Sequence, residues 1–186
     1  MKLNRHLLKS GLIAIALIGL SFPIPKAKAE QLPILPLELD RLAYFEGTWS
    51  CEQPGDLPDD RAIVLTWTVE RDLNDFWYLG YAEEMRSPTN LKPVNAREFL
   101  GYNADLQRLV RFVAVGNGNF LKLTSWGWEN EQFVWEGSLI RMGDSIPIRQ
   151  VIVKKNNDSF AATYFIRNEA NNGWQGVIQE TCDRQS

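Results

Sequence analysis

The chain contains two cysteines, Cys51 and Cys182, so each has only the other as a possible partner. Cys51 lies in the first of a long series of short strand-like segments, and Cys182 lies in the last. A disulfide between them would tie the first and last strands together. An all-β chain whose ends meet is most simply a closed barrel, because closure leaves no sheet edge exposed.

From residue 47 onward, apolar and polar residues alternate with period two, the pattern of strands that bury one face. Short runs rich in Asn, Asp and Gly separate the segments, which favours consecutive antiparallel hairpins. The predicted strands are 47–53, 62–73, 76–85, 96–103, 109–115, 119–128, 132–139, 146–155, 159–168 and 174–183. The predicted inward-facing residues include Ile63, Leu65, Trp67, Val69, Phe160, Ala162, Tyr164 and Ile166.

One short helix is predicted before the first strand. Leu39, Leu42 and Ala43 recur at helical spacing, and Pro36 suits a first helical turn. We expect this helix to plug or flank one end of the barrel. The fold class is therefore all-β, a closed antiparallel up-and-down barrel of about ten strands with a short N-terminal helix.

Residues 1–29 have the pattern of a secretory signal peptide. Lys2, Arg5 and Lys9 precede an apolar run at 11–22 that is too short to span a membrane, and Ala27-Lys28-Ala29 resembles a cleavage site. The alternative is a retained amphipathic or membrane-anchoring helix. We expect an exported protein, periplasmic or extracellular, whose single domain covers residues 30–186.

Removal of this segment takes five of the 20 basic residues and none of the 23 acidic ones, which leaves a net charge of −8. Such a domain lacks the basic surface that binds nucleic acid or anionic lipid. An exported compartment also favours a structural disulfide over free thiols. Redox catalysis is the alternative for the cysteines, but the chain has no Cys-x-x-Cys motif.

Several short motifs resemble those of the secreted DUF1579-type proteins. They are 45–49 (FEGTW) after the helix, 100–102 (LGY) followed by Asp105, 126–128 (WGW) before 133–137 (FVWEG), and the closing 180–182 (ETC). The resemblance implies a lipocalin-like barrel and carries no established activity. Trp49 also resembles the tryptophan of the lipocalin first strand, which an arginine from the last strand covers. Arg184 is the candidate for that arginine.

The disulfide predicts the same pair independently. If Cys51 faces Cys182 across antiparallel strands, two residues back on one strand lie opposite two residues forward on the other. Trp49 then lies opposite Arg184, and a cation–π contact would close the barrel at this end.

The histidine content excludes several kinds of chemistry. The sole histidine, His6, lies in the predicted signal peptide. The domain thus has no histidine for a Ser-His-Asp or Cys-His system, a zinc site or a haem ligand. No phosphate-binding or dinucleotide fingerprint is present either. We expect no metal and no cofactor.

Carboxylates are the remaining candidates for acid–base chemistry. Asp59-Asp60 lies in a proline-flanked loop, and the adjacent Glu83 and Glu84 should point to opposite faces of a strand. The residues with the potential to line an interior are Glu98, Glu136, Glu180, Arg111, Arg149 and Arg167. Outward-facing strand charges are the alternative.

Aromatic residues are numerous, with seven tryptophans and five tyrosines. They indicate either a packed core or a cavity for an apolar or aromatic small molecule. Alternation does not show which side of 120–128 points into the barrel. Lys122, Trp126 and Trp128 share one of the two sides. We favour the cavity, with candidate lining residues Trp67, Trp77, Tyr102, Arg111, Lys122, Trp126, Trp128, Trp135 and Tyr164.

The predicted function is therefore binding or carriage of a small apolar ligand in an exported barrel. The alternative is a structural or protein-interaction module of the cell envelope, which an exposed Trp126-Trp128 pair would favour. An enzyme that uses strand carboxylates is third.

Overall fold

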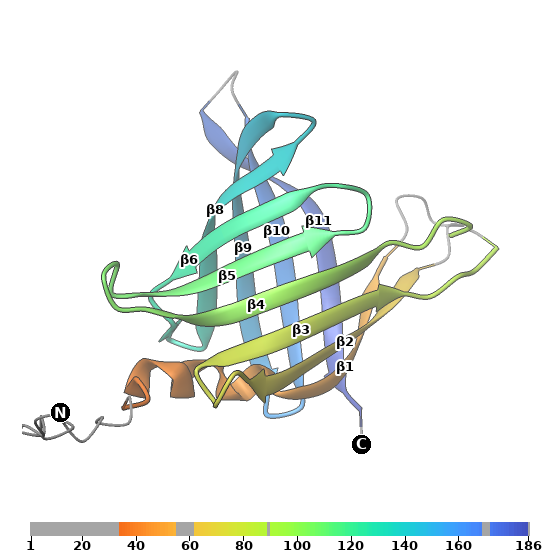
Figure 1. Ribbon diagram of the computed structural model, residues 1–186. Coiled ribbons are helices and arrows are strands. Elements are labelled where there is room, and N and C mark those ends of the chain that lie inside the picture. The colour runs from red at the N-terminus through yellow and green to blue at the C-terminus, as the bar shows by residue number, and fades with distance from the viewer. Residues whose placement is uncertain (1–33, 55–61, 89, 169–171, 186) are drawn as a thin grey trace, which may run out of the picture. The chain divides into compact units, whose positions relative to one another are not determined.

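The computed structural model describes residues 34–54, 62–88, 90–168 and 172–185 (Figure 1). The predicted signal peptide and the Asp59-Asp60 loop lie outside these residues. Strands and one helix make up the fold, in the order η1 (Leu37–Phe45), β1 (Gly47–Gln53), β2 (Ile63–Asp72), β3 (Trp77–Glu84), β4 (Asn95–Asn103), β5 (Arg108–Val115), β6 (Phe120–Ser125), β7 (Trp128–Glu129), β8 (Gln132–Arg141), β9 (Asp144–Asn156), β10 (Ser159–Asn168) and β11 (Gly173–Arg184).

The strands form a closed antiparallel barrel, as the sequence predicts. Consecutive strands pair from β1 through β6 and from β7 through β11. Two further pairings, β1 with β11 and β6 with β8, complete the ring. Among the described residues, no helix is both long and apolar enough to cross a membrane.

The Cys51–Cys182 disulfide is present and joins β1 to β11. The predicted register is confirmed, since Trp49 pairs with Arg184 two positions away. The guanidinium carbon of Arg184 lies 4.2 Å from the centre of the Trp49 ring. The same side chain donates hydrogen bonds to the carbonyl oxygens of Tyr44 and Glu46. Arg184 therefore ties the last strand to both the first strand and the helix.

The helix covers one end of the barrel (Figure 1), and it is a 3₁₀ helix. Three residues per turn bring Leu39, Leu42 and Phe45 onto one face, and all three are buried. The prediction that Ala43 belongs to this face is wrong, because it assumed α-helical spacing; Ala43 is exposed. The Phe45 ring packs against Trp128 and Phe133, so this end of the barrel is filled.

One predicted strand, 119–128, is two strands. β6 ends at Ser125, and Gly127 has a φ of +93°, a conformation that favours glycine. The chain turns there and resumes as the two-residue β7. As a result, Trp126 and Trp128 do not share a face: Trp126 is exposed, whereas Trp128 stacks on Phe45.

Candidate functional site

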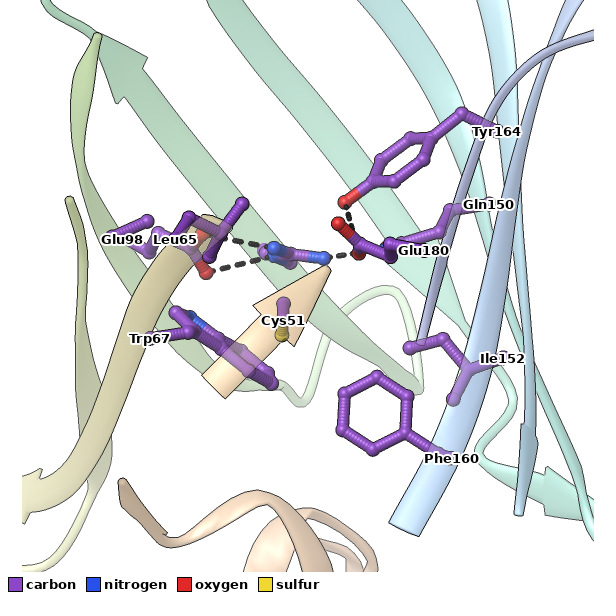
Figure 2. A pocket seen from close by; sticks show the side chains of 11 residues that line it. Cys51, Leu65, Trp67, Glu98, Gln150, Ile152, Phe160, Tyr164 and Glu180 are labelled. Carbon is purple, nitrogen blue, oxygen red and sulfur yellow. Dashed lines mark hydrogen bonds and ion pairs between the residues drawn. The ribbon is translucent and has the colours of Figure 1, made fainter. Parts of the chain in front are cut away.

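The barrel interior contains a cavity toward the end away from η1. Its inner compartment, about 60 Å³, is lined by apolar groups that include Trp67, Ile152, Phe160 and Cys51 (Figure 2). An adjoining compartment of about 180 Å³ reaches the ends of β3, β4 and β5. Both compartments share the same residues where they meet: Leu65, Ala82, Glu98, Arg111 and Tyr164.

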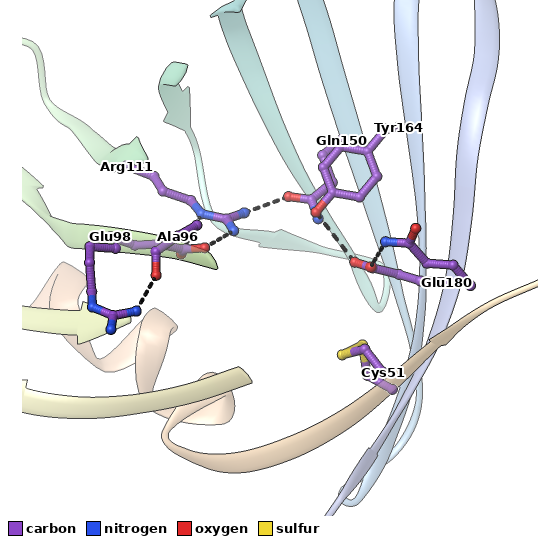
Figure 3. Close-up of polar contacts among 10 residues, drawn as sticks. Cys51, Ala96, Glu98, Arg111, Gln150, Tyr164 and Glu180 are labelled. Carbon is purple, nitrogen blue, oxygen red and sulfur yellow. Dashed lines mark hydrogen bonds and ion pairs between the residues drawn. A yellow bond between two sulfur atoms is a disulfide. The ribbon is translucent and has the colours of Figure 1, made fainter. Parts of the chain in front are cut away.

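A buried ion pair lies where the compartments meet. The Nε and Nη2 atoms of Arg111 each donate to one carboxylate oxygen of Glu98, both at 2.9 Å (Figure 3). The two side chains are only 7% and 3% exposed. Glu98 lies opposite Gly80 on β3, where a Cβ would come within 3.0 Å of the Cβ of Glu98. Glycine at this position leaves the room that the inward carboxylate occupies.

Arg111 also reaches across the barrel. Its Nη1 donates to the side-chain oxygen of Gln150 on β9 at 2.6 Å. Its guanidinium carbon lies 5.6 Å from the centre of the Trp67 ring and 6.0 Å from that of Trp135. Burial by itself lowers the pKa of Arg111, but the carboxylate of Glu98 reverses this and holds the pKa above its ordinary value. Arg111 is therefore a permanent cation inside the barrel.

A second buried carboxylate, Glu180, lies on β11. It accepts hydrogen bonds from the amide of Gln53 and the hydroxyl of Tyr164, each at 3.3 Å. Burial raises the pKa of Glu180, because the charged form loses its hydration. Burial also raises the pKa of Tyr164 well above its usual range, and Glu180 adds to that effect. A carboxyl group that resists ionisation thus accepts a hydrogen bond from a neutral phenol in this site.

Three of the predicted lining residues are brought together in the cavity wall: Trp67, Arg111 and Tyr164. Trp135 lies against Arg111 but belongs to the packed core, with 1% of its surface exposed. Tyr102 and Trp128 also pack against the core, and the indole nitrogen of Trp128 donates to the carbonyl of Arg41 in η1. These two lie at the filled end.

The other three predicted lining residues lie outside, and the prediction is wrong for them. Leu123 and Ser125 take the inward positions of β6, so Lys122 and Trp126 point outward and are exposed. Trp77 alternates with the buried Tyr78, so it lies on the outer face, where it packs over Gly101 of β4. Its flat ring covers the surface that glycine leaves bare.

The carboxylate and arginine candidates also divide between the two faces. Glu98, Glu180 and Arg111 point inward. Glu136 pairs with Arg149 on the outer surface, and Arg167 lies over the Trp174 ring there. Gln150 was not predicted, although a glutamine between the inward positions Ile148 and Ile152 was a visible signal.

No protein-family model matches the chain, and no curated protein sequence matches it. Among solved structures, the chain is similar to Rv2717c from M. tuberculosis, with a TM-score of 0.59 and 13% identity over 82% of this chain and 100% of that one. A redesigned β-barrel gives a TM-score of 0.41 at 8% identity, over 78% and 96% of the two chains. The likeness to Rv2717c shows the barrel fold alone, and the resemblance to DUF1579-type proteins stays a prediction.

Proposed function

We propose that this protein is an exported barrel that binds a small, largely apolar or aromatic molecule in its interior. The observation that carries the proposal is the cavity itself, whose apolar walls converge on the buried cluster of Arg111, Glu98, Gln150, Tyr164 and Glu180. Ligand sites in proteins combine these two features, an apolar enclosure and a few placed polar groups.

The contrast between the η1 end and the middle of the barrel supports this assignment. At the η1 end, aromatic rings fill the interior and stabilise the fold through apolar contacts. In the middle, three ionisable side chains are buried at a cost that apolar residues of similar size would avoid. Buried ionisable groups with shifted pKa values beside a cavity are typical of functional sites.

Export is the second part of the proposal. The disulfide supports it, because such bonds persist in oxidising compartments. The predicted signal peptide points the same way.

Ligand screening with a cavity-filling control tests the binding proposal. Fatty acids, retinoids and aromatic dyes would be scored by tryptophan fluorescence and melting temperature. A ligand at 100 times its dissociation constant stabilises by about 2.7 kcal/mol. Ala82→Leu, which fills the cavity wall, should abolish the shift, whereas Ala114→Leu on the exposed face of β5 should leave it unchanged.

A protein-interaction module is the second candidate, and one observation favours it. Trp126 is 66% exposed beside the η1 end, with the guanidinium of Arg108 over its ring. Exposed Trp and Arg are enriched in protein interfaces. A barrel that shows no response to any screened ligand, together with a partner whose binding is lost in Trp126→Ala, would put this candidate first.

A further inference from the structure

The charges in the cavity wall restrict what the ligand can be. Arg111 is the one cation among the described lining residues, and Glu98 already neutralises it through two hydrogen bonds. Glu180 on the same wall and Glu84 near the opening form no ion pair with a described residue. A ligand carboxylate would therefore enter a site whose one cation is already neutralised, and any of these glutamates that is ionised would repel it strongly.

The unused hydrogen-bonding groups restrict the ligand further. A guanidinium has five N–H donors, and Arg111 uses three of them on Glu98 and Gln150. The two others, one on each terminal nitrogen, donate to none of the described residues. The indole nitrogen of Trp67, in the same wall, is buried and likewise has no partner among these residues. Buried donors of this kind are costly unless an acceptor meets them.

An ammonium group does not fit these donors, because it has three N–H groups and no acceptor. It would neutralise an ionised Glu180 but leave the free N–H groups of Arg111 and the indole N–H of Trp67 without an acceptor. A neutral oxygen meets both requirements, since it accepts hydrogen bonds and adds no charge. When Glu180 is protonated, its hydroxyl is one more donor on the same wall.

We infer that the ligand is an uncharged molecule with a carbonyl or hydroxyl oxygen on an apolar or aromatic body, and that this oxygen accepts hydrogen bonds from the free N–H groups of Arg111. The inference rests on the proposed binding function and names the class of ligand. The aromatic rings of Trp67 and Phe160 flank the inner compartment that receives the body of the ligand (Figure 2).

Three probes of nearly the same shape test it by isothermal titration calorimetry at pH 7: 4-phenylbutan-2-one, 3-phenylpropanoate and 3-phenylpropylamine. The ketone should bind at least about tenfold more tightly than either charged probe. A carboxylate or amine that binds as tightly as the ketone would overturn the inference and leave the binding function standing. No binding by any probe, to the wild-type chain or its variants, would overturn both.

Two variants and a matched control locate the effect. Glu98→Gln frees the charge of Arg111, so affinity for 3-phenylpropanoate should rise about tenfold or more. Glu180→Gln leaves the ion pair intact and removes a carboxyl group, so it should weaken discrimination against 3-phenylpropanoate. This variant provides the test if Glu98→Gln does not fold. Glu52→Gln makes the same change on the exposed face of the neighbouring strand β1 and should change no affinity. Unchanged selectivity in both cavity variants would contradict the inference.

Discussion

Arg184 lies over the indole ring of Trp49 at 4.2 Å and donates hydrogen bonds to the carbonyl oxygens of Tyr44 and Glu46. One side chain thus joins the last strand, the first strand and the end of the helix. A lysine at this position would also carry a positive charge, but it lacks the planar guanidinium that makes these contacts together.

Loss of this arginine should destabilise the barrel. Arg184→Met removes hydrogen bonds to three carbonyl oxygens, the ion pair with Asp158 and a cation–π contact, so we expect the free energy of unfolding to fall by about 2–3 kcal/mol. Urea denaturation measures the difference. Arg141→Met, at an exposed position of β8, should change it by less than about 0.5 kcal/mol. Equal effects at both positions would mean that Arg184 does not fasten the barrel.

The disulfide should supply a large share of the stability, because it links residues 131 positions apart. Replacing both cysteines with alanine should lower the free energy of unfolding by about 4–5 kcal/mol in the chain-entropy model. Peptide mapping without reductant first establishes that the bridge forms in natively produced protein. Free Cys51 and Cys182 in protein from an oxidising compartment would argue against this prediction.

The buried ion pair should show strong coupling. Glu98→Gln or Arg111→Met alone should each cost about 3–5 kcal/mol, because each leaves a buried group without its partner. The double variant should be more stable than the sum of the two losses implies. A double-mutant cycle by chemical denaturation measures this coupling. The exposed pair of Glu136 and Arg149 is the control, with a coupling below about 1 kcal/mol.

Glu180 should make stability depend on pH. Its pKa is raised in the folded state, chiefly by burial and despite Gln53, Arg111 and Tyr164 around it, with Glu98 adding to the increase. Between the unfolded and folded pKa values the folded chain binds more protons, so stability falls as pH rises through this window. Relative to the wild type, Glu180→Gln should gain stability above the window and lose that advantage as pH falls through it.

Thermal melts of both chains from pH 4 to pH 8 measure the difference. Glu52→Gln, exposed on β1, should track the wild type at every pH. A constant offset between Glu180→Gln and the wild type across this range would show that the carboxyl does not titrate as described.

The sequence alone determined the fold class, the closure and the register at the seam. Period-two alternation and short polar turns specify antiparallel hairpins, since both signals are local. The two cysteines added one long-range constraint, and the pairing of Trp49 with Arg184 followed from it because strand pairing is regular.

Tertiary structure decided which groups meet inside the barrel. Alternation divides a strand into two faces but does not say which face is inner, so Lys122 and Trp126 were placed on the wrong side. The backbone of Gly127 then separated Trp128 from Trp126, and the 3₁₀ spacing put Phe45 rather than Ala43 against the core. Glu98 and Arg111 lie on the paired strands β4 and β5, but Arg111 meets Gln150 only because barrel closure brings β9 opposite β5 across the interior. Such contacts depend on curvature and closure of the whole sheet, which no local pattern encodes.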